Sequence, residues 1–179
     1  MPRTSRSFAC LLAVIFVGVV AVKAQMPMPK PAPELAKLDY LAGTWTSDAD
    51  LKPSPFGPGG KMTSTDEARW MEGKFFLVMH SKFTSAMGDG TSLAIFGYDP
   101  EKKVYTYNEF NSMGQANHSE GTVDGDNWTW TSEQKMGGQM IKSRYTIKVT
   151  SPTTYDVKYE MSQDGTNWTT IMEGKAKKK

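Results

Sequence analysis

The stretch YLAGTWTSD, residues 40–48, stands where the apolar pattern of the chain changes its period. Upstream of Gly43, Leu35, Leu38 and Leu41 recur every three residues, which predicts a short amphipathic helix that ends at this glycine. Downstream, apolar and polar residues alternate one by one over segment after segment, as they do in half-buried strands. The stretch therefore predicts the start of an all-β domain directly after one short helix.

Turn signals divide the rest of the chain into about ten expected strands. Asp-Gly and Gly-Gly pairs, such as those at 124–125, 137–138 and 164–165, supply the positive φ angles of tight hairpins. The expected strands cover residues 44–52, 61–71, 74–84, 91–98, 103–111, 115–123, 127–135, 139–150, 154–162 and 167–176. A long antiparallel meander must curl or close to protect its edges. We therefore predict an up-and-down antiparallel β-barrel, with a two-sheet sandwich as the alternative.

The N-terminal residues are typical of a secretory signal peptide. Arg3 and Arg6 precede an apolar run over 8–22, which is shorter than the roughly 20 residues of a membrane-spanning helix. We expect a signal peptide over 1–24, a proline-rich spacer over 25–33 and a barrel domain over 34–179. Such a protein is exported to a periplasm or beyond the cell, with no membrane span after cleavage.

Removal of the signal peptide changes what the composition implies. The only cysteine, Cys10, is lost, so the mature chain forms no disulfide. Loss of Arg3, Arg6 and Lys23 brings the formal net charge from +2 to about −1, which gives no electrostatic footprint for nucleic acid. We interpret the terminal lysines, 177–179, as a solvated tail.

Catalytic motifs are incomplete. The segment 117–121 has Asn117 in place of the first glycine of a nucleophile elbow, and 57–61 departs from the phosphate-binding loop in spacing. With only His80 and His118, a zinc site of several histidines is excluded, and no metal site is expected. One axial histidine for haem remains possible as a cofactor ligand.

Aromatic residues on the expected strands are the main functional signal. Inward aromatics either fill the core of a barrel or line a pocket. A mid-strand arginine can capture a carboxylate if it faces the interior. The expected ligand-lining residues are Trp70, Tyr107, Glu109, His118, Trp130, Arg144, Tyr145 and Tyr159.

Three Met-Gly pairs, at 87–88, 113–114 and 136–137, all fall at the ends of expected strands. Flexible thioethers in such places form an adaptable apolar rim or, alternatively, collect a soft metal such as Cu(I). The interpretation as a rim places a ligand entrance at this end of the barrel.

The ordered landmarks LAGTW (41–45), GKFFL (73–77), LAIFGYDP (93–100), NEFNSMG (108–114), SEG (119–121) and SQDGTNW (162–168) resemble the bacterial exported family called domain of unknown function 1579. That family is similar to the calycin group of lipocalins, fatty-acid-binding proteins and nitrobindins. The resemblance implies a β-barrel of about ten strands in which Gly43 and Trp45 close one end. Nitrobindins carry haem on a histidine late in the barrel, and no histidine follows His118 here.

Three functions are compatible with these features. The first is a non-catalytic exported barrel that binds a small apolar or amphipathic molecule. The second is a haem-binding or histidine-dependent enzyme of nitrobindin-like type that uses His118 or His80 with Glu109 or Glu120. The third is a fully packed structural or interaction barrel.

Overall fold

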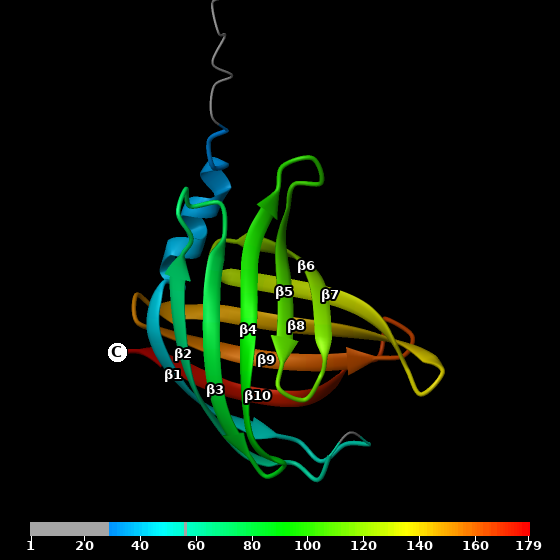
Figure 1. Ribbon diagram of the computed structural model, residues 1–179. Coiled ribbons are helices and arrows are strands. Elements are labelled where there is room, and N and C mark those ends of the chain that lie inside the picture. Colours follow the sequence, from blue (N-terminus) through cyan, green and yellow to red (C-terminus); the bar gives the residue numbers. More distant parts are fainter. Residues whose placement is uncertain (1–28, 56) are drawn as a thin grey trace, which may run out of the picture.

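The computed structural model describes residues 29–55 and 57–179 and shows ten antiparallel strands closed into one barrel (Figure 1). This confirms the predicted all-β, up-and-down architecture. The expected signal peptide and most of the expected spacer lie outside the described residues. No helix within the described ranges has the length and apolar character needed to cross a membrane.

Each strand pairs with the next along the chain, and β10 returns to pair with β1. The elements are η1 (Pro33–Tyr40), β1 (Gly43–Leu51), β2 (Gly60–Trp70), β3 (Leu77–Ser85), β4 (Gly88–Asp99), β5 (Val104–Asn111), β6 (Ala116–Asp124), β7 (Asn127–Met136), β8 (Gln139–Ser151), β9 (Thr154–Ser162) and β10 (Thr169–Lys178). Closure pairs most of both edges of every strand, and so protects the edges of the meander.

The short helix η1 plugs one end of the barrel (Figure 1). It is a 3-10 helix, and its three-residue period explains why Leu35, Leu38 and Leu41 all lie on one buried face. The Tyr105 hydroxyl donates to the Glu34 carbonyl at 2.8 Å, and the Tyr40 hydroxyl bonds carbonyls at the β8–β9 turn. These long-range bonds hold the plug in place.

Trp45 lies directly beneath the plug and is completely buried. Its indole nitrogen donates to the Leu41 carbonyl at 2.9 Å, and its ring packs against Tyr155 at 4.7 Å and Tyr40 at 5.3 Å between centroids. Gly43 has a φ of 114°, which suits glycine alone at the bend between η1 and β1. The expected closure of one barrel end by Gly43 and Trp45 agrees with this geometry.

Two local predictions were wrong. Residues 74–76 are not in a strand, because Lys74 adopts a left-handed φ of 57° in the turn before β3. The terminal lysines are not a free tail, since Lys178 pairs with Trp45 across the β1–β10 ladder. The Lys178 ammonium lies 5.2 Å from the Trp45 ring centroid and donates to the Tyr40 carbonyl at 3.2 Å. This lysine therefore belongs to the closed end.

No helix of the described residues covers the opposite end of the barrel, which we call the open end, and all three Met-Gly pairs lie there. They belong to the β3–β4, β5–β6 and β7–β8 turns, which the up-and-down topology places on the side away from η1. The side chains of Met87 and Met113 are each about half exposed. The predicted location of the Met-Gly turns, away from Trp45, agrees with this arrangement.

The barrel interior changes in polarity from the closed end to the open end. Near η1 it is a core of aromatic and aliphatic side chains, including Trp45, Phe96, Trp128 and Trp130. Toward the open end, serine occupies many positions that share the inward face of the strands: Ser47, Ser64, Ser81, Ser92, Ser119, Ser132 and Ser143. Most of these serines are only partly buried, so this half of the interior is more accessible to solvent than the core.

Candidate functional site in the β6–β7 cleft

The barrel wall parts between β6 and β7. Their ladder ends at the pair Glu120–Thr131, although β7 remains paired to β8 as far as Met136–Gln139. The β7–β8 hairpin accordingly reaches away from the β5–β6 turn (Figure 1). A cleft of about 610 Å³ occupies this region.

The cleft is lined by residues from both faces of the wall. Asn117, Ser132 and Ser143 belong to the inward face of their strands, whereas His118, Glu120 and Lys142 belong to the outward face. Because the β6–β7 ladder is interrupted beside these residues, inward and outward side chains meet in this cleft.

Trp168 forms part of the cleft rim, and Arg144 holds it there. The Arg144 guanidinium lies 4.3 Å from the Trp168 ring centroid and donates two hydrogen bonds, of 3.0 and 2.7 Å, to Glu160. Lys158 contacts the other oxygen of Glu160 at 2.6 Å. Although burial alone would raise the pKa of Glu160, these two cations lower it. Arg144 therefore positions the rim from outside the barrel.

The β9–β10 loop that carries Trp168 is organised around Asp164. Its carboxylate accepts hydrogen bonds from the backbone of Thr166 and Asn167, both at 2.8 Å, and from the Asn167 side chain at 2.7 Å. Backbone and side-chain bonds from Asn167 make the largest contribution to lowering the pKa of Asp164. The SQDGTNW motif thus encodes a preformed loop that presents an aromatic ring to the cleft.

Behind the cleft, two chains of polar contacts lead inward. Asn117 donates to the Glu109 carboxylate at 3.4 Å. Burial raises the pKa of the Tyr107 hydroxyl, and the charge and hydrogen bonding of Glu109 raise it further. Ser143 bonds Ser132 at 2.7 Å and also interacts with the Tyr159 hydroxyl. Residues of the cleft are therefore in direct contact with those of the interior.

Asp66 is a second interior carboxylate and is 9% exposed. It accepts a hydrogen bond from Ser64 at 2.8 Å and interacts with Ser81 on the neighbouring strand. Burial raises the pKa of Asp66 more than these bonds lower it. Asp66 and Glu109 both raise the pKa of the deeply buried Tyr145 hydroxyl, after burial itself. The two carboxylates thus act on the same region of the interior.

Trp130 contributes an unpaired donor to this region. It is 3% exposed, faces the interior between Gly121 and Tyr145, and packs at 5.8 Å from Phe96 and 6.5 Å from Tyr107 between ring centroids. Its indole nitrogen is the one buried side-chain polar atom without a hydrogen-bond partner among the described residues. Buried donors are normally paired, so this atom is a candidate ligand contact.

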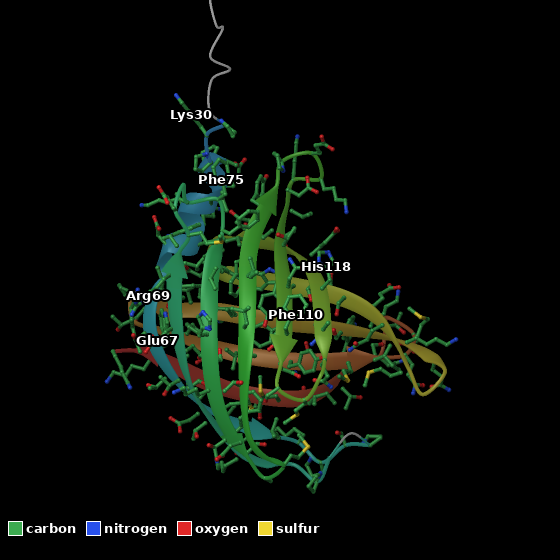
Figure 2. The ribbon with its side chains drawn as sticks, in the orientation of Figure 1. Lys30, Glu67, Arg69, Phe75, Phe110 and His118 are labelled. Atoms are coloured by element: carbon green, nitrogen blue, oxygen red, sulfur yellow. The ribbon has the colours of Figure 1, made fainter. Side chains whose placement is uncertain are left out.

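The structure brings together five of the expected ligand-lining residues: Tyr107, Glu109, Trp130, Tyr145 and Tyr159. Trp70 also faces inward but lies at the closed end, where its indole donates to Asp39 of η1 at 2.6 Å. His118 and Arg144 lie on the outer surface of the wall beside the cleft, and His118 can be followed in Figure 2.

Neither histidine of the chain faces the interior. The His118 side chain is 57% exposed and bonds Asn108 at 2.8 Å, with Glu120 at 4.0 Å. His80 is exposed on the outer face of β3. An axial histidine for a haem inside the barrel is therefore not provided by the residues present. Within the described ranges, no three His, Cys, Asp or Glu side chains gather as metal ligands.

Sequence reasoning missed Asp66 and the inward serines. Asp66 lies two and four residues before Ala68 and Trp70, so all three share the inward face of β2. Assigning faces strand by strand would have found it, whereas selection by aromatic neighbours did not.

A second groove, of about 760 Å³, crosses the outer face of β1 to β4. Most of its lining residues point outward, among them Thr46, Thr63, Thr65 and Thr91, and none of the lining residues is buried. Inward-facing Ser47, Ser64, Phe83 and Gly90 also contribute, but the β1–β2, β2–β3 and β3–β4 ladders are continuous at this place, so the groove is a depression in an intact wall.

The fold and the cleft define a closed ten-stranded antiparallel β-barrel with a cleft in its wall between β6 and β7. Residues 30–178 match the family described as "Protein of unknown function (DUF1579)", and the chain belongs to that family. This confirms the family that the sequence landmarks indicated.

Solved structures with the same fold are distant in sequence. Rv2717c from M. tuberculosis is 13% identical, with a TM-score of 0.57, and the match covers 84% of this chain and 99% of that one. The S-type phycobiliprotein lyase CPES from Guillardia theta is 9% identical, with a TM-score of 0.51 and coverage of 79% and 88%. At these identities the likeness shows the fold alone. A search of curated proteins finds no significant match.

Proposed function

We propose that this protein is an exported, non-catalytic barrel that binds one small amphipathic molecule in its interior and admits it through the β6–β7 cleft. The observation that carries the proposal is the parting of the wall, which makes the inward-facing residues Asn117, Ser132 and Ser143 part of the cleft lining. In a fully packed barrel no ligand would have to pass through such an opening in the ladder.

The polarity of the interior supports an amphipathic ligand. The aromatic floor of Phe96, Tyr107 and Trp130 suits an apolar body. The carboxylates and serines above it suit polar substituents. The absence of an inward histidine favours binding over the histidine-dependent alternative.

The test places a bulky side chain on one face of β7 and, as a control, on the other. Gln134 lines the cleft from the inward face of β7, and its neighbour Lys135 points outward. We expect Gln134→Trp to weaken binding of Nile red, an uncharged environment-sensitive dye, by at least tenfold, and Lys135→Trp to leave it unchanged. Circular dichroism checks that both variants fold. If wild-type protein binds neither Nile red nor any other small molecule by native mass spectrometry, the proposal is wrong.

A further inference from the structure

Acidic side chains outnumber basic ones on the inward face of the strands. Asp66 and Glu109 both face inward, and both act electrostatically on the hydroxyls of Tyr107 and Tyr145. The only basic residue on the inward face of the strands described is Lys178, and its ammonium is held by the Tyr40 carbonyl at the closed end. The two carboxylates therefore have no cationic partner among the residues that the structure describes.

The contrast with Glu160 shows what a paired carboxylate looks like in this chain. Glu160 has 8% of its side chain exposed and contacts two cations, Arg144 at 2.7 Å and Lys158 at 2.6 Å. Asp66 is similarly buried but has only serine partners. The ionised form of a buried carboxylate is unfavourable unless it is paired, so a cation that entered the interior would stabilise ionised Asp66 without displacing a protein cation.

The unpaired Trp130 indole is an independent candidate contact for a ligand. Its N–H is buried in the same interior and has no acceptor. A ligand that reaches Tyr107 also reaches the face of the barrel that carries Trp130, because the two rings are 6.5 Å apart. The interior thus lacks one hydrogen-bond acceptor and one positive charge.

We infer that the ligand is a small protonated amine with an apolar body and an oxygen acceptor. The ammonium pairs with Glu109 and Asp66, the apolar body packs on the aromatic floor, and the oxygen accepts from Trp130. The surrounding tyrosine rings also suit a cation, because their π faces attract positive charge. This inference rests on the proposed function, since it names the chemical class of the ligand of the same site.

Three probes of nearly the same shape test the inference: tyramine (cation), tyrosol (neutral) and 4-hydroxyphenylacetate (anion). Isothermal titration of the purified protein at pH 7 measures each affinity. We expect tyramine to bind at least tenfold more tightly than tyrosol, and 4-hydroxyphenylacetate to bind most weakly. Glu109→Gln should weaken tyramine binding by at least tenfold and leave tyrosol binding unchanged.

Glu67→Gln is the matched control. Glu67 lies on the outer face of β2, 3.7 Å from Arg69, and both can be followed in Figure 2. It should leave all three affinities unchanged. Asp66→Asn provides a second interior variant should Glu109→Gln fail to fold.

The outcomes separate the inference from the proposed function. Equal or tighter binding of tyrosol or 4-hydroxyphenylacetate overturns the amine inference but preserves a binding barrel. Binding of Nile red without binding of tyramine has the same meaning. If Glu67→Gln weakens tyramine binding as much as Glu109→Gln does, the amine binds the outer surface and the inference is wrong.

Discussion

Trp45 and Trp130 make a matched pair for testing the account of the interior by stability. Both are at least 97% buried and belong to the same core cluster. Replacing either with phenylalanine removes a similar amount of apolar surface, so the loss of burial largely cancels between the two variants. What differs is the indole N–H, which is bonded to the Leu41 carbonyl in Trp45 and unpaired in Trp130.

The expected difference follows from that one group. Trp45→Phe loses a buried hydrogen bond and leaves the Leu41 carbonyl without this donor, a cost of about 1–3 kcal/mol. Trp130→Phe removes an unpaired buried donor, which recovers about 1–3 kcal/mol of desolvation in the unliganded protein. We therefore expect Trp130→Phe to be more stable than Trp45→Phe by about 2–6 kcal/mol, the sum of the two contributions.

Urea unfolding followed by circular dichroism measures this difference, on protein refolded from denaturant so that no ligand is carried over. A thermal melt should show a higher Tm for Trp130→Phe, by about 2–4 °C for each kcal/mol in a chain of this size. Equal destabilisation of the two variants would refute the reasoning, because it would mean that the Trp130 N–H is as well paired as that of Trp45.

Three further predictions concern the wall and its buried charges. Gly121→Ala should lower the unfolding free energy measured in urea by about 1–3 kcal/mol, because the new Cβ would lie 2.6 Å from Trp130 Cδ1 and 2.7 Å from the Thr129 carbonyl oxygen. The control Gly57→Ala meets only the flexible Met87 sulfur at 3.3 Å and should be near neutral, so equal effects of the two substitutions would contradict the packing described. Asp66→Asn should raise the unfolding free energy by about 1–2 kcal/mol at pH 7, since the raised pKa of Asp66 means that its ionisation opposes folding. Thermal melts over pH 4–8 should show that this gain shrinks as the pH falls toward the pKa of Asp66 in the unfolded state. A gain that grew on acidification would contradict the expected sign. Arg144→Met should lower the unfolding free energy measured in urea by about 1–3 kcal/mol, because it leaves Glu160 with Lys158 as its only cationic partner. The same substitution should expose Trp168 to the quencher acrylamide. Unchanged quenching of Trp168 fluorescence would contradict the role of Arg144 in positioning the rim.

The sequence predicts the strands well because their signals are local. Turn pairs such as Asp124-Gly125 and Gly137-Gly138 sit where hairpins occur, with positive φ at both Gly137 and Gly138. The helix before Gly43 is equally local, since its leucines need only a three-residue period. The start of β3 is mispredicted because Phe75 and Phe76 have strand propensity, while the conformation of Gly73 and Lys74 forces a turn.

The candidate site is harder to predict, because it depends on which strands separate. Alternation identifies Tyr107, Glu109 and Trp130 as sharing a face, but no local signal shows that β6 before Glu120 and β7 after Thr131 are not paired with each other. His118 and Arg144 are among the expected ligand-lining residues, and both neighbour inward residues in the sequence. Strict alternation along β6 and β8 would have assigned both to the outer face, where they lie. The pairing of Lys178 with Trp45 is a contact between the two ends of the domain, so it depends on barrel closure.

The central claim is that a ligand occupies the interior beside Trp130, and the indole N–H resonances test it most directly. In a ¹⁵N-labelled protein titrated with tyramine and, separately, with tyrosol, the Trp130 resonance is assigned from its loss in Trp130→Phe. The account predicts that this resonance shifts until the site is saturated, while the Trp45 resonance, bonded to Leu41 at the closed end, stays in place. An unmoved Trp130 resonance at saturating probe, with shifts confined to outer-surface residues, would contradict it.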